Sequence, residues 1–323
     1  MTVLGEAGGE SAVNGSRTRP LKVGLMLPQA EGRHGGGTAG WADMLAMAQR
    51  AEELGFDSIW TIDHFILAYP DKPQQGVWEN WSLLAALAAS TSRVELGPLV
   101  TPTSFHNPAM LAKIADTVDE ISDGRLILGL GAGWVEREYQ AMGLPYDHRV
   151  SRFEEAIQII HGLLRSGAVD FEGKYYSARE CELRPRGPRP NGPPILIGSS
   201  GERMLRIMAR YGDAWNAFFG KTGNSHSGVA PLRETVDAAC RAEGRDPATL
   251  ERTVATFVAF DLPGTTGHPD VQTPITGTPE EIATALRAYA SEGINHIQVF
   301  LDPMTLAGVE AFAPVLEALD RGA

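Results

Sequence analysis

The chain has 323 residues, 43% of them hydrophobic, and a formal net charge of -12 at pH 7. This length allows one large α/β barrel or two modest domains. The negative charge argues against a nucleic-acid partner or an anionic membrane, because clustered lysine and arginine side chains bind such surfaces. The only two cysteines, Cys181 and Cys240, can build neither a disulfide framework nor a cysteine-based zinc site.

The N-terminal segment and the hydropathy of the chain bear on where in the cell the protein is found. Residues 1–20 are rich in Gly, Ser and charged residues and lack the apolar stretch of a secretory signal, so we expect a flexible tail. Residues 21–323 are expected to form a single domain. No segment is apolar for long enough to span a bilayer. Together with the low cysteine content, this predicts a cytoplasmic protein with no membrane partner.

From residue 21 onward, short β-rich runs alternate with longer helical patterns, as in βαβ units around a parallel sheet. We expect strands at 23–28, 58–64, 94–102, 125–133, 194–200, 213–219, 253–260 and 296–302. We expect helices at 41–54, 81–90, 109–121, 151–164, 202–211, 232–242, 279–290 and 305–319. Eight such pairs without internal repeats favour a closed (β/α)8 TIM barrel over an open doubly wound sheet.

Two kinds of interruption break this alternation. Residues 166–193 precede the fifth strand and contain the run RPRGPRP at 184–190, which predicts an irregular, proline-stiffened excursion. A helix-to-strand connection lies at the N-terminal end of a barrel, so we expect its arginines at the surface or in a subunit contact. Residues 30–40 and 65–80 follow strands one and two and are expected to form lids over the active face.

Polar side chains at the C-terminal ends of the strands are the first candidates for function, because the βα loops of a barrel meet there. Asp63 and His64 form the most specific pair, since a carboxylate and an imidazole can fix a polar heterocycle and move a proton near neutral pH. By position alone, His64 could equally anchor a neighbouring loop. Other polar candidates at strand ends are Gln29, Thr101, Thr103, Ser104, His106 and Asn216.

Two glycine-containing segments follow strands four and five. Gly198-Ser199-Ser200-Gly201 leads from an apolar strand into a helix, so its N–H groups, hydroxyls and the positive helix end suit a phosphate. A plain serine-capped turn is the competing interpretation. The GLGAG run at 129–133 ends an interior strand rather than opening a Rossmann helix. Its glycines, Gly131 among them, are expected to let a flat ligand or a neighbouring strand approach.

Aromatic residues gather near the same face. Trp78, Trp81 and Trp134 lie in or beside the predicted loops and could wall a planar ligand, although core packing is favoured for Trp81. We expect Trp78, Trp134 and His106 to contact the substrate. No HExxH motif, paired cysteines, serine elbow or carboxylate cluster occurs, so we expect no metal site and no acyl-transfer chemistry.

Several stretches, taken together and in this order, resemble the bacterial luciferase-like superfamily, whose members are barrels that bind FMN or the deazaflavin coenzyme F420. The resemblance spans residues 21–302. Its stretches are AEELGFDSIW at 51–60 running into Asp63-His64, LVTP at 99–102 with HNP at 106–108, DTVDEISDGR at 116–125 with 129–134, and PPILIG at 193–198 with ARYGDAWN at 209–216. The pattern is most similar to the deazaflavin-dependent branch.

This resemblance implies a cofactor ring across the barrel mouth, with its phosphate on the turn Gly198, Ser199, Ser200, Gly201. It places the ring edge near Asp63, His64, Gly131 and the end of strand three at Val100 and Thr101. In deazaflavin members, the residue matching His64 often gives or takes a proton. That branch also commonly has a non-proline cis peptide at the end of strand three. The sequence departs from the pattern at two places: Val135 replaces a common Asn, and Ser199-Ser200 replaces a Gly-Gly turn.

The resemblance and the strand-end residues together predict an enzyme that uses F420 for hydride transfer to or from a small organic substrate, with His64 handling the proton. FMN-dependent oxidation with O₂ is the alternative, because the same scaffold accepts both cofactors. An alternative of another class is a catalytically silent flavin-binding protein. The partner is expected to be a small molecule, and a homodimer stays open as the assembly.

Overall fold

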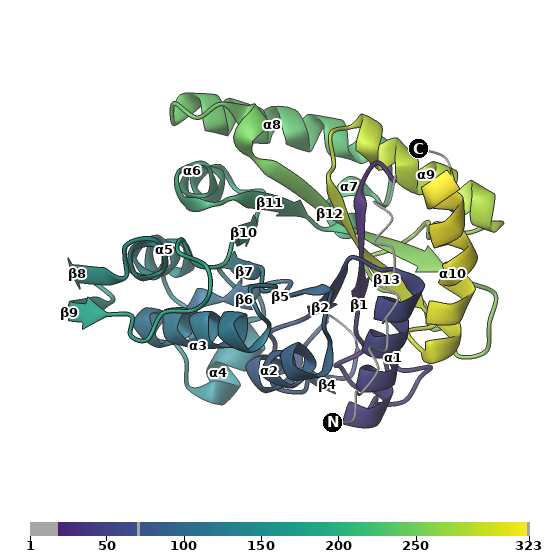
Figure 1. Ribbon diagram of the computed structural model, residues 1–323, viewed down its shortest axis with the longest axis horizontal. Helices are drawn as coiled ribbons and strands as arrows, with labels where there is room; N and C mark the ends of the chain where they lie inside the picture. The colour runs from purple at the N-terminus through teal and green to yellow at the C-terminus, as the bar shows by residue number, and fades with distance from the viewer. Residues whose placement is uncertain (1–18, 70–71, 322–323) are drawn as a thin grey trace, which may run out of the picture.

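The computed structural model describes residues 19–69 and 72–321. The predicted tail at 1–20 therefore lies outside the described residues except for Arg19 and Pro20. Parallel strands form the centre of the fold and helices surround them (Figure 1). This arrangement confirms the predicted (β/α)8 barrel.

The barrel wall is one sheet of parallel strands in the order β5-β2-β1-β13-β12-β11-β10-β7-β6. Because β5 and β6 are two pieces of the predicted strand 94–102, the sheet has eight strand positions around the barrel, which we call staves. Leu96 in β5 bridges Leu126, and β6 pairs with β7, so the third stave meets the fourth and closes the barrel. The strands are β1 Lys22–Met26, β2 Ser58–Thr61, β5 Glu95–Pro98, β6 Thr101–Pro102, β7 Leu128–Gly131, β10 Ile195–Gly198, β11 Ala214–Ala217, β12 Glu251–Ala259 and β13 His296–Asp302.

The outer ring of helices agrees with the predicted helices to within a few residues. Gly55 ends the first helix in the left-handed conformation, and Thr278 and Glu281 form a capping box at the start of the seventh. None of the described helices is both long and apolar enough to cross a membrane. The ring consists of α1 Trp41–Leu54, α2 Asn80–Ser90, α3 Pro108–Ile121, α5 Arg149–Ser166, α6 Glu202–Tyr211, α8 Val229–Ala242, α9 Pro279–Ser291 and α10 Leu306–Arg321.

Two hydrophobic clusters divide the interior. The larger lies between the barrel wall and the helices and contains the apolar faces of both. The smaller is made of side chains that fill the barrel itself, with Trp60, Phe219, Phe257 and Phe300 as its largest members. Strands buried on both faces explain the nearly continuous apolar runs in the sequence.

The glycines of strand four are required by strand three. A Cβ on Gly129 would lie 2.0 Å from the carbonyl oxygen of Pro98, and one on Gly131 would lie 2.6 Å from Cγ2 of Val100. The prediction that these glycines admit a neighbouring strand is therefore confirmed. The Leu99–Val100 peptide bond, at this approach, is cis, at the place where the resemblance implies one.

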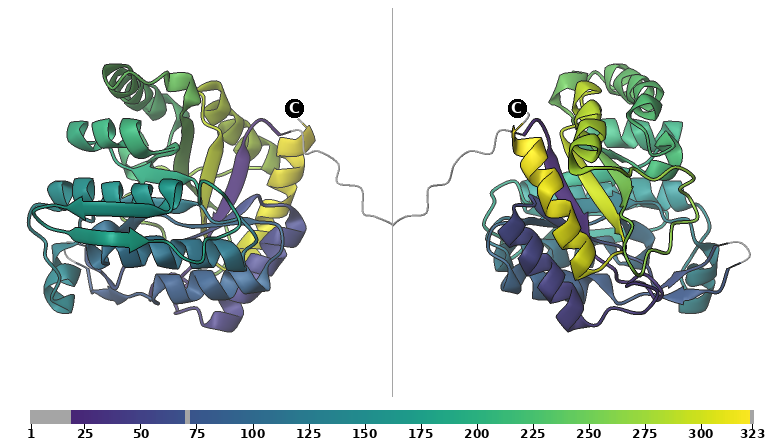
Figure 2. Two further views of the ribbon diagram at one scale, coloured as in Figure 1. Left: turned by 60° about the vertical axis from the view of Figure 1, so that its left-hand side comes forward. Right: turned by 90° about the vertical axis from the view of Figure 1, so that its right-hand side faces the viewer.

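The excursion at 166–193 was predicted to be irregular, and for half of its length this is wrong. β8 Ala168–Glu172 and β9 Ser177–Glu182 form an antiparallel hairpin that packs on α5 (Figure 2). The alternating burial of β8 is a strand pattern that the proline-rich run beyond it obscured. Arg184 of that run is exposed, whereas Arg189 attaches the run to α3 Pro108–Ile121 by pairing with the buried carboxylate of Asp119 at 2.5 Å.

The two predicted lids bind each other over the mouth of the barrel. β3 Ile66–Leu67 and β4 Gln75–Gly76 form a short hairpin in the second lid. Ala30 of the first lid bridges Val77 of the second. Glu31 closes the junction, because its carboxylate accepts the N–H of Gly76 at 2.7 Å. The lids are therefore one connected cover rather than two separate flaps.

Candidate active site at the barrel mouth

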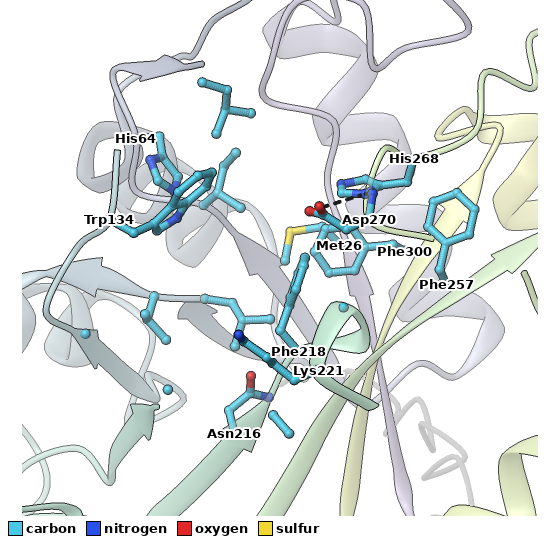
Figure 3. Close-up of a pocket in the computed structure, with 18 of the residues that line it drawn as sticks. Met26, His64, Trp134, Asn216, Phe218, Lys221, Phe257, His268, Asp270 and Phe300 are labelled. Atoms are coloured by element: carbon cyan, nitrogen blue, oxygen red, sulfur yellow. Dashed lines mark hydrogen bonds and ion pairs between the residues drawn. The ribbon is translucent and has the colours of Figure 1, made fainter. Parts of the chain in front are cut away.

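A cavity of about 770 Å³ opens at the C-terminal ends of the strands, within the size range of small-molecule sites. All eight staves or the residues that follow them contribute to its lining, so the cavity is a property of the closed barrel. His64 and Trp134 lie on one side of it and His268 and Phe257 on the other, with Met26, Phe218 and Phe300 between (Figure 3).

His64 is held by a carboxylate that comes from a different part of the chain. Its Nδ1 lies 2.9 Å from Oε1 and 3.2 Å from Oε2 of Glu138, a fully buried side chain on the short helix α4 Glu136–Met142. Glu138 also accepts the N–H of Phe65 at 3.0 Å. Because a carboxylate only accepts hydrogen bonds, Nδ1 of His64 carries a hydrogen, and in the neutral ring this leaves the lone pair on Nε2.

Trp134 forms the wall beside this histidine. The two rings meet edge to face at 5.9 Å between centroids, and both line the cavity. The indole of Trp134 is 52% exposed, so its remaining face is available to a planar ligand. The sequence-based assignment of Trp134 to the substrate wall stays a prediction, supported by this position.

The predicted phosphate turn also lines the cavity. Gly198, Ser199, Ser200 and Gly201 lead from β10 into α6, and Gly201 occupies the N-cap position without any side-chain cap. The N–H groups of the first helical turn are therefore free of a capping side chain and lie at the positive end of the helix dipole. A Cβ on Gly201 would meet nothing within 4 Å, which leaves room beside the backbone.

Val100 and Gly131 line the cavity. Four other residues predicted to contact cofactor or substrate do not line it: Asp63, Thr101, Trp78 and His106. Asp63 is buried behind the wall, where its Oδ2 lies 3.4 Å from Nε2 of His106. Thr101 is fully buried in β6. Trp78 is 52% exposed and donates its indole N–H to Ala39 at 2.9 Å, so it joins the two lids.

Other polar residues from strand ends serve the wall of the cavity. Asn216 donates from Nδ2 to Thr253 and to Gln298, each at 2.8 Å, and so ties together β11, β12 and β13. Gln29 donates from Nε2 to the carbonyl of Ile62 at 3.1 Å and fixes the start of the first lid to the end of β2. Both residues line the cavity, but the amide of Gln29 and the Nδ2 group of Asn216 are engaged by the protein.

Sequence reasoning missed two residues that the structure brings to the site. Glu138 was not considered, because a glutamate in the first turn of a short helix is typical of an exposed helix start. His268 was also missed, since the loop 260–278 after strand seven shows no periodicity. A usable signal existed for that loop: it follows a barrel strand at the C-terminal face and is long enough to fold over the mouth.

The sequence is similar to characterised enzymes of one family. The family model described as luciferase-like monooxygenase matches residues 21–262. F420-dependent glucose-6-phosphate dehydrogenase of Kineococcus radiotolerans is 34% identical over 252 residues, which cover 75% of this chain and 69% of that protein. Pyrimidine monooxygenase RutA of Stutzerimonas stutzeri is 34% identical over 209 residues, 62% of this chain and 56% of that protein.

Solved structures show the same fold at lower sequence identity. An F420-dependent secondary alcohol dehydrogenase in complex with an F420-acetone adduct superimposes with a TM-score of 0.77 at 20% identity, covering 93% of this chain and 99% of that one. The F420-dependent tetrahydromethanopterin reductase of Methanopyrus kandleri gives a TM-score of 0.72 at 18% identity, covering 92% and 98%. The match of the family model over most of the chain decides the assignment: this protein belongs to the luciferase-like monooxygenase family.

Proposed function

We propose that this protein is an F420-dependent oxidoreductase that moves a hydride to or from a small organic substrate, with His64 exchanging the accompanying proton. The observation that carries the proposal is the pairing of His64 with buried Glu138 at the edge of a cavity that also contains the turn 198–201. The F420-dependent relatives support the choice of cofactor.

The residues that we assign to the cofactor lie on four consecutive staves of the barrel. The turn 198–201 follows β10, Gly131 ends β7, Val100 lies between β5 and β6, and His64 follows β2. These staves are neighbours around the barrel, in the order β10, β7, β6 with β5, and β2. A planar cofactor with a phosphate can therefore extend along one half of the mouth, from the helix start of α6 to His64.

The residues of this half fit such a group. The uncapped start of α6 offers backbone N–H groups to a phosphate, and Ser199 and Ser200 add hydroxyls. The opposite end of the same half offers Val100 and Trp134 as apolar and aromatic walls for a ring. No lysine or arginine is needed at the phosphate, because helix N-termini bind anions through N–H groups and the dipole.

The side chains would work as follows. When bound, F420 would supply the hydride chemistry, accepting a hydride from an alcohol in its oxidised form and donating one to a carbonyl or enone in its reduced form. His64 holds a lone pair at Nε2 because Glu138 fixes the hydrogen on Nδ1, so the imidazole accepts a proton when an alcohol is oxidised. In the opposite direction the imidazolium returns that proton, and the Glu138 carboxylate stabilises its charge.

A second candidate is an FMN-dependent monooxygenase. The similarity to pyrimidine monooxygenase RutA over 62% of the chain favours it, and the phosphate turn suits FMN as well. The two candidates differ in their need for oxygen, because reduced FMN reacts with O₂ in monooxygenases whereas the hydride transfer proposed here does not consume it.

A titration with both oxidised cofactors tests the proposal. Purified protein is mixed with increasing F420 or FMN, and the change in cofactor absorbance or fluorescence gives each dissociation constant. We expect F420 to bind more tightly than FMN. Binding of FMN with no measurable binding of F420 would transfer the assignment to the monooxygenase.

A further inference from the structure

The half of the cavity opposite the proposed cofactor residues is mainly aromatic. Phe218 follows β11, Phe257 lies in β12, Phe300 lies in β13 and Met26 ends β1, and all four side chains line the cavity. These strands are also neighbours around the barrel. Figure 3 shows Phe257 on the side of the cavity away from His64, with Met26, Phe218 and Phe300 between the two. The barrel mouth therefore has two halves of different chemistry.

The imidazole of His268 lies in this aromatic half, on a loop that is hydrogen-bonded to the end of a barrel strand. Asp302, at the end of β13, accepts the N–H of Thr266 at 2.9 Å and of Gly267 at 2.7 Å. These bonds hold the loop 260–278 against the barrel. The residues on either side of His268 are exposed, yet its own side chain is only 5% exposed. The loop thus turns a single histidine inward.

The aromatic neighbours of His268 surround the ring. Its centroid lies 4.9 Å from that of Phe219, 5.8 Å from Phe257 and 6.2 Å from Phe218. Tyr69 of the second lid meets it edge to face at 6.2 Å. The centroid of His268 also lies 6.4 Å from that of Phe300 in β13. Contacts with residues of β12 and β13, with the segment after β11 and with a lid fix the position of the imidazole, so any hydrogen bond that it makes into the cavity has a defined direction.

The protonation of His268 is set by its surroundings. Its Nδ1 accepts the N–H of Asp270 at 3.2 Å, so the hydrogen of the neutral ring resides on Nε2. Burial lowers the pKa of His268 to about 3, and the positive charges of Arg33 and Lys72 act in the same direction. At neutral pH the ring is an uncharged donor of one hydrogen bond.

We propose that this aromatic half binds the apolar body of an uncharged substrate and that His268 donates a hydrogen bond from Nε2 to its carbonyl or hydroxyl oxygen. The inference rests on the proposed function and names its substrate class: an apolar ketone, enone or alcohol. This substrate class differs from the phosphorylated sugar for which one relative is named.

An anionic substrate group does not suit this half. Aromatic faces carry a partial negative charge, and transfer of a phosphate from water into apolar surroundings is costly without paired cations. Among the described lining residues within β11, β12, β13 and β1 themselves, none is Lys or Arg, but Lys221, in the short helix α7 Phe219–Thr222 after β11, also lines the cavity, close to Asn216 (Figure 3). Arg33 reaches the cavity from the first lid, on the side where Tyr69 also lines it.

Three small molecules and four forms of the protein test this proposal. The molecules are acetophenone, ethylbenzene, which lacks the oxygen acceptor, and glucose 6-phosphate, which is polar and anionic. Calorimetric titration measures each dissociation constant with oxidised cofactor bound, so that no turnover occurs. The proteins are the parent chain, His268→Phe, His268→Gln and the control His226→Phe, which changes an exposed histidine outside the cavity.

We expect the parent to bind acetophenone more tightly than glucose 6-phosphate. His268→Phe should weaken acetophenone binding about three- to tenfold, the effect of one hydrogen bond, without weakening ethylbenzene binding. His268→Gln, which retains an N–H donor, should stay closer to the parent than His268→Phe does, and His226→Phe should match the parent.

Tighter binding of glucose 6-phosphate, or equal weakening of acetophenone and ethylbenzene by His268→Phe, would overturn the proposal. If His268→Phe fails to fold, His268→Leu takes its place. If neither cofactor binds, the proposed function fails, and the same titrations on the protein alone still decide the substrate class.

Discussion

Nδ1 of His64 lies 2.9 Å from the buried carboxylate of Glu138, although 74 residues separate them in sequence. The barrel brings the loop after β2 and the helix after β7 together, and the carboxylate also holds the N–H groups of Phe65 and Ile66. The contact therefore orients both the imidazole and the backbone that carries it. Glu138 acts as a positioning residue for the proposed proton exchange.

Glu138→Gln tests that role. The amide keeps the shape and one acceptor oxygen, but it no longer enforces the hydrogen on Nδ1 or stabilises an imidazolium. We expect kcat to fall about 10- to 100-fold, as for the loss of other orienting partners, with cofactor affinity nearly unchanged. Glu136→Gln, on the exposed face of the same helix, is the matched control. Equal kcat values for Glu138→Gln and the parent would show that the carboxylate serves only the loop.

His64→Ala separates catalysis from binding. Loss of a positioned proton donor or acceptor costs roughly 10²- to 10⁴-fold in rate. We expect steady-state turnover to drop within this range while a cofactor titration gives a dissociation constant close to that of the parent. An unchanged rate would reduce His64 to an anchor for the second lid. If the parent itself shows no turnover, the catalytically silent binding protein is favoured.

The double variant Ser199→Asp, Ser200→Asp tests the phosphate turn. Two carboxylates beside a bound phosphate introduce like-charge repulsion, which costs several kcal/mol, so cofactor affinity should fall by roughly 100-fold or more. The melting temperature should change little because both positions lie at the edge of the cavity. Ser199→Ala, Ser200→Ala is the neutral control. Full cofactor affinity in the Asp variant would place the phosphate elsewhere.

The lowered pKa of His296 leads to a prediction of how the free energy of unfolding depends on pH. This histidine is fully buried inside the barrel, with Nε2 2.7 Å from the hydroxyl of Ser58, and burial lowers its pKa from 6.5 to about 3. Between these values the unfolded chain binds a proton that the folded protein does not, so acidification lowers the free energy of unfolding. For one such group the loss between pH 7.5 and 5.0 is about 2 kcal/mol.

Urea denaturation at the two pH values measures this loss. The variant His296→Gln should lose about 2 kcal/mol less on acidification than the parent does. His226→Gln, at an exposed histidine, should behave like the parent. If His296→Gln and the parent lose stability equally, folding does not lower the pKa of His296.

Local patterns were sufficient to predict the barrel and part of the site. Strand and helix positions follow from hydrophobic periodicity, and His64 and the turn 198–201 could be found because they directly follow predicted strands. Glu138 could not be found in this way, since only the closed barrel brings helix α4 to the loop after β2. His268 lies in a loop whose path depends on a distant carboxylate, Asp302.

The hairpin at 168–182 shows a different limit. Its burial alternates along β8, but the strand is short and exposed residues outnumber buried ones in both of its strands. The proline-rich run that follows dominated the composition of the segment. Trp78 shows the same limit for single residues, because an exposed aromatic residue in a lid can face the cavity or the other lid, and only the fold decides.

The most direct test of the proposed chemistry is an anaerobic reaction of the purified protein with reduced F420 and an unsaturated ketone such as 2-cyclohexenone. We predict that the absorbance of oxidised F420 appears as the ketone is reduced, in equal amounts and without oxygen. A parallel reaction with reduced FMN is run with and without O₂. Turnover that needs reduced FMN and stops when oxygen is removed would contradict the account and identify a monooxygenase.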